Sequence, residues 1–217
     1  MSRWKNASFA GRTISELKRA AVLRESGRLF SRRGYHNTSL SDVAKQLGVS
    51  KGTLYNYVKD KQEILFEIHR MALEIGTRSL AEAEASNENG AQMVAAAMKG
   101  FILSLVAELG GYGILSEVGA LKPDDRDQVM SLRSNFYQRF EALVTRGIHD
   151  GSIRSINPHV PLVAFMGVLQ NLPNWYSPKG RLTAEEIAEA VVEVFMRGFA
   201  LGEHPAPPEA ARNGGAG

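Results

Sequence analysis

The sequence predicts an all-α protein with two domains, and three observations carry this prediction. Apolar residues recur at spacings of three and four along most of the chain, which is the period of an amphipathic helix. No segment shows the alternation of apolar and polar residues that is typical of a half-buried strand. The charge is unevenly divided, because residues 1–80 hold 15 Lys and Arg against 7 Asp and Glu, whereas residues 81–217 hold 11 against 16. We therefore expect a basic N-terminal module joined to an acidic remainder.

The first helix is expected over residues 15–33, after a polar, basic segment at residues 1–14. That segment lacks the apolar stretch of a signal peptide, and we expect it to be flexible, either as a free tail or as an arm along phosphates. Val22, Ser26 and Phe30 recur at a spacing of four residues. They therefore form the inward face of the helix.

Residues 39–58 predict two short helices joined by a tight turn. Ser39 is a good N-cap, and Asp42 follows three residues later, as in a capping box. Gly48 ends the first helix, because glycine adopts the left-handed conformation without strain. The second helix, residues 51–57, is too short to be stable alone. It has to pack on the helix before it and present its polar side to a partner, which is the helix-turn-helix arrangement that reads the DNA major groove.

Apolar stripes and capping residues predict the remaining helices. The fourth is expected to begin at Asp60, where Glu63 completes a capping box, and to continue to residue 85. Further helices are expected at residues 91–109, near 114–120, and at 125–149, 158–171 and 183–201. The expected divisions of the chain are a flexible arm (1–14), a helix-turn-helix domain (15–62), a helical bundle with the fourth helix as connector (63–202) and a disordered tail (203–217).

Three stretches resemble the tetracycline-repressor (TetR) family of transcriptional regulators. They are LRESGRLFSRRGYHNTSLSDVAKQLGVS, KGTLYNYVKDKQEIL, and Lys61 at the start of the fourth helix. The resemblance covers roughly residues 15–75, and beyond it only the layout is similar. It implies a three-helix DNA-binding domain, followed by a helical bundle that binds an effector and forms a homodimer.

The resemblance also implies which residues contact a double-stranded DNA operator. Lys, Thr, Asn and Tyr side chains can reach base edges and phosphates, and glycine lets the backbone come close to the DNA. Two of the tyrosines could instead be partly buried against the fourth helix. The expected DNA-contacting residues are Thr38, Ser39, Lys51, Gly52, Thr53, Tyr55, Asn56, Tyr57 and Lys61.

Members of the family bind small, mostly apolar molecules inside the C-terminal bundle. The expected lining of that pocket is Phe101, Leu105, Tyr112, Phe136, Tyr137, Phe140, Asn171 and Trp175. The alternative is that these side chains fill the core without touching a ligand. The segment NLPNWYSPKGRLTAEEIAE resembles members that regulate fatty-acid and acyl-CoA metabolism, which favours an acyl-CoA effector. An aromatic or drug-like effector, or a DNA-binding protein without any effector, are the other possibilities.

Residues 158–171 are apolar almost all round, and such a helix has to be buried on all sides. In a bundle of this size, its outer side would be exposed in a monomer. We therefore expect a partner helix from a second copy of the chain, and a fully internal helix is the alternative. The expected interface residues are Leu162, Phe165, Met166, Leu169, Val191, Phe195 and Phe199.

Composition argues against several other classes of protein. The chain has no cysteine, which excludes disulfides and thiolate chemistry. The five histidines lack metal-ligand spacing and no phosphate-binding glycine motif is present, so we expect no metal, no cofactor and no enzyme. The longest apolar run, residues 160–172, is shorter than the roughly 20 residues of a membrane span. We therefore expect a cytoplasmic protein, and the resemblance to the TetR family implies a repressor that a small apolar effector releases from DNA.

Overall fold

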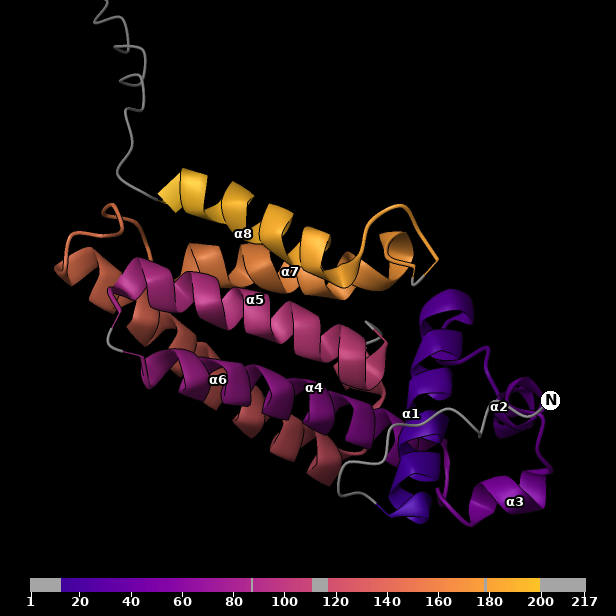
Figure 1. Cartoon of the computed structure of the whole chain (residues 1–217). Helices are drawn as coiled ribbons and strands as arrows, with labels where there is room; N and C mark the ends of the chain where they lie inside the picture. The colour runs from indigo at the N-terminus through magenta and orange to yellow at the C-terminus, as the bar shows by residue number, and fades with distance from the viewer. Residues whose placement is uncertain (1–12, 87, 111–116, 178, 200–217) are drawn as a thin grey trace, which may run out of the picture.

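The structure, a computed structural model, describes residues 13–86, 88–110, 117–177 and 179–199 (Figure 1). Within these ranges it consists of α-helices and one short 3-10 helix without any strand, which confirms the all-α class. The elements are α1 (Ile14–Arg33), α2 (Leu40–Leu47), α3 (Lys51–Tyr55), α4 (Lys61–Glu84), α5 (Gly90–Leu109), η2 (Glu117–Ala120), α6 (Pro123–His149), α7 (His159–Trp175) and α8 (Ala184–Phe199). The expected disordered tail at 203–217, and all but the last two residues of the expected arm, lie outside the described residues.

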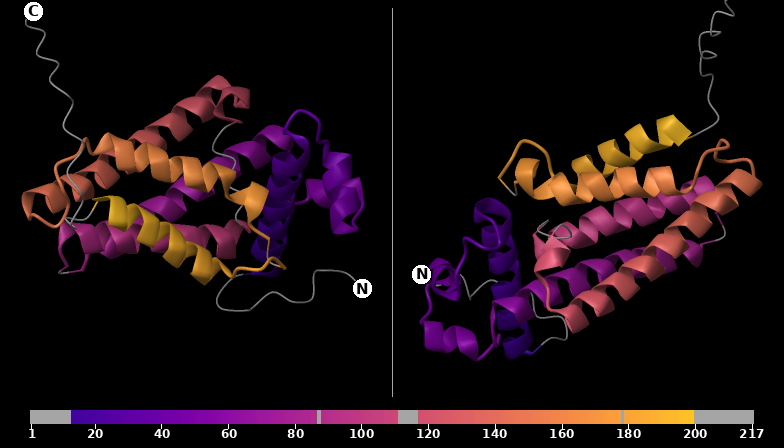
Figure 2. Two further views of the ribbon diagram at one scale, coloured as in Figure 1. Left: turned by 90° about the horizontal axis from the view of Figure 1, so that it is seen from above. Right: turned by 180° about the vertical axis from the view of Figure 1, so that it is seen from behind.

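Helices α1, α2 and α3 form a unit at one end of the molecule, and α4 extends from it into a bundle with α5–α8 (Figure 1). In the bundle α4 packs along α5 and α6, and α8 packs on α5. Figures 1 and 2 show α7 and α8 on the side of α5 that faces away from α4. Helix α4 therefore belongs to both parts of the molecule.

Side-chain caps fix the starts of α2 and α4. Ser39 and Asp42 form the expected capping box at α2. At α4 the Asp60 carboxylate accepts the Glu63 N–H at 2.7 Å, as expected. The Glu63 carboxylate, however, accepts the N–H of Lys59 at 2.5 Å instead of that of Asp60. The reciprocal half of this capping box is therefore shifted by one residue along the chain.

Two helices end at positions that differ from the prediction. Helix α3 ends at Tyr55 rather than at residue 57, because the Tyr57 N–H bonds to the carbonyl of Leu54, three residues back, and tightens the turn. Helix α7 runs to Trp175, four residues beyond the expected end, and passes through Pro173. Pro173 has no N–H for the carbonyl of Leu169 and its ring crowds that carbonyl, so the helix continues for two residues past a position that normally kinks or ends it.

A glycine brings α4 and α5 into close contact. A Cβ atom added at Gly76 would lie 2.7 Å from Cε1 of Phe101 and 2.9 Å from Cε2 of Phe136, closer than carbon atoms pack. Only a residue without a side chain therefore lets both rings lie against the backbone of α4. The two rings are themselves in edge contact, with centroids 5.5 Å apart.

Helix α5 corrects the expectation that no segment is long and apolar enough to cross a membrane. By length and composition alone it would suffice. In the structure α5 packs against α4, α6 and α8, and nine of its residues, including Phe101, Ile102 and Leu105, are buried. Its apolar composition is therefore explained by its central place in the bundle.

Candidate functional sites: the recognition helix and the effector bundle

The turn between α2 and α3 has the geometry that a helix-turn-helix unit requires. Gly48 adopts the left-handed conformation, with φ 69° and ψ 33°. The next residue, Val49, donates its N–H to the carbonyl of Ala44 at 3.0 Å, which closes the end of α2. Ser50 then caps α3 by accepting the N–H of Thr53 at 3.0 Å.

Helix α3 is anchored on one side and exposed on the other. Leu54 and Val58, in and just after α3, are buried in the core. Lys51, Gly52, Tyr55 and Asn56 are exposed, and the Lys51 ammonium lies 5.8 Å from the centroid of the Tyr55 ring. Thr53 is half-buried, and its hydroxyl lies 2.8 Å from that of Ser50. Tyr57 is half-buried as well, so the outward surface of this segment consists mainly of Lys51, Gly52, Tyr55 and Asn56.

The loop before α2 places its two expected phosphate contacts differently. The Thr38 side chain is buried, and its hydroxyl donates to the carbonyl of Gly34 at 2.9 Å. The Ser39 side chain is exposed and donates to the Asp42 carboxylate at 2.5 Å. Hydrogen bonds from Ser39 lower the pKa of the Asp42 carboxyl, which stays charged at the start of α2. In this structure the Thr38 hydroxyl points inward, and only Ser39 of this pair offers its side chain to an outside partner.

Lys61 braces this loop from the start of α4. Its ammonium donates to the carbonyl of Tyr35 at 2.7 Å and to that of Thr38 at 3.0 Å. It also lies 4.1 Å from the centroid of the Tyr35 ring, so a cation–π contact adds to the hydrogen bonds. Partial burial lowers the pKa of Lys61. An ammonium has three donors, so one remains for a phosphate. The contact of Tyr35 with this lysine was not predicted, because the two residues lie 26 positions apart in the sequence and no local pattern joins them.

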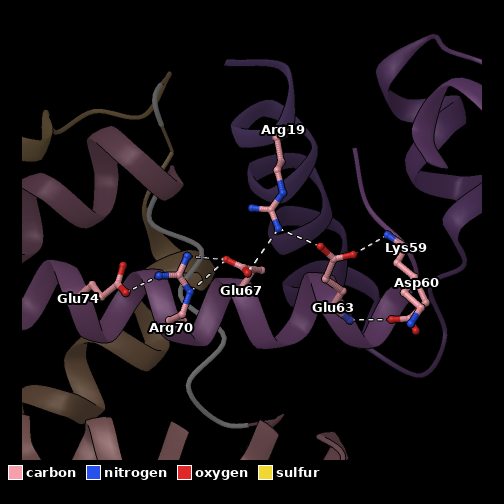
Figure 3. Close-up of polar contacts among 7 residues, drawn as sticks. All are labelled: Arg19, Lys59, Asp60, Glu63, Glu67, Arg70 and Glu74. Carbon is pink, nitrogen blue, oxygen red and sulfur yellow. Dashed lines mark hydrogen bonds and ion pairs between the residues drawn. The ribbon is translucent and has the colours of Figure 1, made fainter. Parts of the chain in front are cut away.

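An ion-pair network joins α1 to the first turns of α4 (Figure 3). The Arg19 guanidinium of α1 lies 3.0 Å from the Glu63 carboxylate and 3.4 Å from that of Glu67. Arg70 lies 2.7 Å from Glu67 and also pairs with Glu74. The hydrogen bond to Glu67 is the main reason that the pKa of Arg70 is raised. The network holds the N-terminal unit on α4 at a place that no sequence motif marks.

A second contact ties α1 to the end of α5. Arg24 donates to the carbonyls of Ala107 and Glu108, at 3.2 and 3.3 Å. These carbonyls belong to the last turn of α5, where unsatisfied oxygens carry partial negative charge. Glu108 in turn pairs with Arg78 of α4. Helices α1, α4 and α5 are thus in polar contact where the two halves of the molecule meet.

The bundle gathers four of the expected effector-pocket residues and places a fifth at their edge. Phe101, Leu105, Phe136 and Phe140 are all buried, and the rings of Phe136 and Phe140 lie 6.2 Å apart. Phe165 of α7 completes this cluster and stacks on Phe140 at 6.0 Å. Tyr137 is half-buried at the edge, with its ring 6.1 Å from that of Phe136.

The remaining three positions of the expected pocket lie elsewhere. Asn171 and Trp175 are exposed on α7, and the Asn171 amide donates to the carbonyl of Gly167, one turn back on its own helix. They do not join the aromatic cluster in this structure. Tyr112 lies outside the described residues.

A buried histidine on a core-facing position was not anticipated. His69 of α4 is fully buried, and its Nδ1 lies 2.8 Å from the carbonyl oxygen of Leu65. Because a carbonyl only accepts, Nδ1 carries the proton and Nε2 is an acceptor, for which the described residues provide no partner. Burial lowers the pKa of His69, the Leu65 carbonyl opposes this, and the charge of Arg133 on α6 lowers it further.

The expected dimer-interface residues occupy both buried and half-buried positions of a single chain. Leu162, Phe165, Met166 and Leu169 are buried inside the core of a single chain, so in this arrangement they are not available to a second copy. On α8, Val191 and Phe195 are half-buried against the core, and the side chain of Phe199 lies outside the described part. The exposed large apolar side chains of α7 and α8 are Val160, Val163, Trp175 and Val194.

Two family models match the chain. Residues 22–68 match the model described as bacterial regulatory proteins of the tetR family, which spans most of α1, all of α2 and α3, and the start of α4. Residues 87–199 match the model described as the tetracyclin repressor-like C-terminal domain. The second match alone covers more than half of the chain.

Among the described residues, no group of three or more His, Cys, Asp or Glu side chains is arranged to hold a metal ion.

Known proteins resemble the chain over nearly their full length. It is 25% identical over 186 residues to the transcriptional repressor KstR2 of Rhodococcus jostii (strain RHA1), which covers 84% of this chain and 91% of that protein. The solved regulator PfmR from Thermus thermophilus is 27% identical, with a TM-score of 0.68 over 83% of this chain and 98% of its own. AibR, solved with isovaleryl coenzyme A and operator DNA, is 26% identical, with a TM-score of 0.65 over 82% and 97%. The helix-turn-helix unit, the bundle and both matches together show that the chain belongs to the TetR family of transcriptional regulators.

Proposed function

We propose that the chain is a homodimeric, cytoplasmic repressor without enzymatic activity that binds a pseudo-palindromic operator and releases it when a small apolar effector binds. The construction of α3 carries this proposal. Leu54 holds the helix in the core, while Lys51, Tyr55 and Asn56 are exposed on its outward surface. A short helix that is held in this way and carries donors on its free side is suited to the DNA major groove.

An acyl-CoA is the effector that the comparisons support best. AibR was solved with isovaleryl coenzyme A and operator DNA together. The fatty acid metabolism regulator protein of Bacillus subtilis (strain 168) is 21% identical over 179 residues, covering 79% of this chain and 90% of that protein. The aromatic cluster of Phe101, Phe136, Phe140 and Phe165 would contact the acyl chain. An aromatic or drug-like molecule is the alternative occupant of the same cluster.

The proposed mechanism is a shift between two populations of the dimer. An effector that separates the rings of the aromatic cluster moves α5 and α6 relative to α4. Because Arg24 ties α1 to the last turn of α5, and Arg19 ties α1 to Glu63 and Glu67 of α4, the N-terminal unit follows that movement. Effector and operator then favour different separations of the two α3 helices, so that each weakens the binding of the other.

The test is a titration of the purified protein onto fluorescent operator DNA, with and without an acyl-CoA chain-length series. Weaker operator binding with at least one acyl-CoA, and no change with free CoA, is the expected result. If the whole series leaves operator affinity unchanged, the acyl-CoA proposal fails. Mass spectrometry of ligand released from the purified protein then identifies the occupant of the bundle directly.

A DNA-binding protein without any effector is the second candidate, and the packing of the bundle favours it. Phe101, Phe136, Phe140 and Phe165 are fully buried and contact one another at centroid distances of 5.5–6.2 Å. The space that an effector would take is thus filled by the protein's own rings. A protein that releases no ligand on denaturation, and whose operator affinity responds to no apolar compound, would support this candidate.

A further inference from the structure

Arg133 is a cationic side chain in a row of core residues on α6. Val129, Phe136 and Phe140 are each about 1% exposed, and with Arg133 they follow one another at spacings of four, three and four residues. That spacing places all four on one face of the helix, which faces the bundle. Arg133 itself is half-buried. A guanidinium at such a position normally has a carboxylate partner.

No carboxylate pairs with Arg133 in the part of the chain that the structure describes. Its Nε donates to the hydroxyl of Tyr137 at 2.8 Å, and its guanidinium carbon lies 4.9 Å from the centroid of that ring. Glu141 lies on the same side of α6, but its carboxylate pairs with Nδ1 of His159 at 2.7 Å. The outer nitrogens of the guanidinium therefore remain as donors for a further group.

The surroundings of Arg133 suit an anion. The Tyr137 hydroxyl accepts the bond from Arg133, so its own proton can be donated to a second acceptor. A hollow of about 390 Å³ opens beside these groups. It is lined by Met130, Arg133, Ser134, Tyr137, Gln138 and Glu141. All six residues lie on α6 and Met130 is 45% exposed, so the hollow is on the solvent side of this helix. The Tyr137 ring, 6.1 Å from that of Phe136, connects it to the aromatic cluster.

We propose that Arg133 and Tyr137 form an anchor for an anionic group on an apolar effector, with the apolar part directed at Phe136 and Phe140. The ligand class is an amphiphilic anion, either the carboxylate of a fatty acid or a phosphate of an acyl-CoA. This inference rests on the proposed function, because it assigns a binding site to the effector. It adds a charged anchor at the edge of the aromatic cluster, and a neutral apolar molecule of equal size would not use it.

Calorimetry with three eight-carbon compounds tests the anchor in the full-length protein. The compounds are octanoate, octanoyl-CoA and octan-1-ol, which share an eight-carbon chain. Octanoate and octan-1-ol differ mainly in charge, whereas octanoyl-CoA adds the phosphates, the nucleotide and the pantetheine arm of CoA, so free CoA is measured beside it. In the wild type, at least one of the two anions should bind at least about tenfold more tightly than the alcohol, because charge-assisted hydrogen bonds are the stronger kind. If only octanoate binds more tightly than the alcohol, the anchored group is the carboxylate. If only octanoyl-CoA does so, the anchored group is a phosphate.

The variants separate the anchor from the rest of the site. Arg133→Gln should weaken the anion by about tenfold or more and leave octan-1-ol unchanged, which also shows that the variant is folded. Arg133→Lys should retain part of the affinity, because the charge is kept. Arg126→Gln changes an exposed arginine on the same helix and should bind like the wild type.

Two results would overturn the anchor, and neither depends on DNA. One is that Arg133→Gln binds the anions as tightly as the wild type, and the other is that neither anion binds the wild type. Operator binding is measured separately by fluorescence anisotropy. If an apolar compound still releases the operator, the proposed repressor function stands without the anchor. If anions bind through Arg133 but never change operator affinity, the anchor stands and the proposed release mechanism fails.

Discussion

Lys61 shows how one residue can serve both the fold and a ligand. Its ammonium bonds to the carbonyls of Tyr35 and Thr38, so it fixes the loop that leads into α2. Lys61→Ala should weaken binding to operator and to random DNA about equally, because a phosphate contact carries no sequence information. In a symmetric dimer the slope of log affinity against log salt should fall by roughly two.

The measurement is a set of titrations of both DNAs at several salt concentrations. Lys99→Ala is the matched control, because Lys99 lies on α5, where it pairs with Glu189. Thermal unfolding of both variants reports any loss of the brace at Tyr35 and Thr38. An unchanged salt slope for Lys61→Ala would show that this lysine has only the structural role.

His69 makes stability depend on pH. Burial is the main cause that lowers its pKa in the folded protein, so the neutral form is favoured there, while the unfolded chain titrates near the ordinary value of about 6.5. The unfolded state therefore binds more protons than the folded state as the pH falls below about 6.5. The free energy of unfolding is accordingly unaffected by His69 above that pH and decreases below it. The steepest decrease is about 1.4 kcal/mol per pH unit.

Chemical denaturation between about pH 5 and 8 tests this expectation on the wild type and on His69→Gln, because this range spans the ordinary histidine pKa. Glutamine cannot titrate, so the free energy of unfolding of the variant should fall less steeply below about pH 6.5. The exposed histidines His36, His149 and His159 are the same in both proteins and cancel in the difference. Parallel curves for the two proteins would mean that His69 is not the titrating group.

At the scale of the element, α3 is the part that should discriminate between DNA sequences. Lys51 lies at its first position and is exposed, and Thr53 follows two residues later with its hydroxyl beside that of Ser50. Lys51→Ala and Thr53→Ala should reduce the ratio of operator affinity to random-DNA affinity at fixed salt. A lost bidentate base contact corresponds to about 1–3 kcal/mol of discrimination. If both variants keep the wild-type ratio, α3 does not read bases through these residues.

The contact between α4 and α5 should be sensitive to a single methyl group at Gly76. The added Cβ would lie within 2.9 Å of two rings of the packed core, so the rings or the helix must shift. Overpacking of this kind costs about 1–3 kcal/mol, which exceeds the helix-propensity gain of up to about 1 kcal/mol. Gly76→Ala should therefore lower the free energy of unfolding.

Gly100→Ala is the control for that variant at the same contact. Its Cβ would lie 3.4 Å from Ser79, a distance that the neighbouring side chain can accommodate. The propensity gain should then dominate, and stability should stay equal or rise. Urea titration of both variants gives the comparison, and equal destabilisation by the two would contradict the role assigned to the Phe101 and Phe136 rings.

Capping residues and stripes predict most of the elements, because both signals are local. Ser39, Asp42 and Gly48 mark α2 correctly, since a cap and a left-handed glycine act within one turn of the chain. The end of α7 was placed too early, because its last turn tolerates Pro173. Which face of α7 is buried was not predictable either: a helix that is apolar all round has no polar side to mark the outside.

The candidate sites also contain residues that local sequence patterns predict and residues that they do not predict. The outward side chains of α3 follow from its spacing, because the buried residues Leu54 and Val58 leave only one direction for the rest. Arg133 was not anticipated, because an arginine in a helix is usually solvated, and only the row formed with Val129 and Phe136 shows that it faces the bundle. The contact of Arg24 with α5 joins residues more than 80 positions apart, which no local pattern reveals.

At the scale of the whole molecule, α1 is held by contacts from two directions. Arg19 binds Glu63 and Glu67 of α4, and Arg24 binds the end of α5. Surface ion pairs like those of Arg19 are each worth about 0.2–1 kcal/mol, and the Arg24 contact consists of hydrogen bonds to backbone carbonyls, so these contacts bias an orientation without fixing it irreversibly. The proposed release from an operator requires that the N-terminal unit adopt a second orientation when an effector changes the bundle.

The exposed apolar side chains of α7 and α8 lead to the last prediction, which concerns assembly. Val194 is 72% exposed and Val163 is 44% exposed, whereas Phe165, one of the interface residues expected from the sequence, is buried in its own chain. Exposed apolar side chains gathered on neighbouring helices are typical of a protein interface. We therefore expect a dimer in which α7 and α8 meet their counterparts, and Val194→Glu should shift it toward monomers, because it would bury a charge without a partner.

Light scattering at micromolar protein concentration measures the assembly, and Ala142→Glu, at an exposed position of α6, is the control. Operator binding gives an independent readout. A dimer carries two α3 helices, so it should prefer half-sites whose centres lie roughly 34 Å, or a multiple of that, apart. The Val194→Glu protein should lose this dependence on spacing while keeping its weaker affinity for a single half-site, because α3 is far from the change (Figure 1). A variant that stays dimeric would place the interface elsewhere, and a monomeric wild type would contradict the dimer itself.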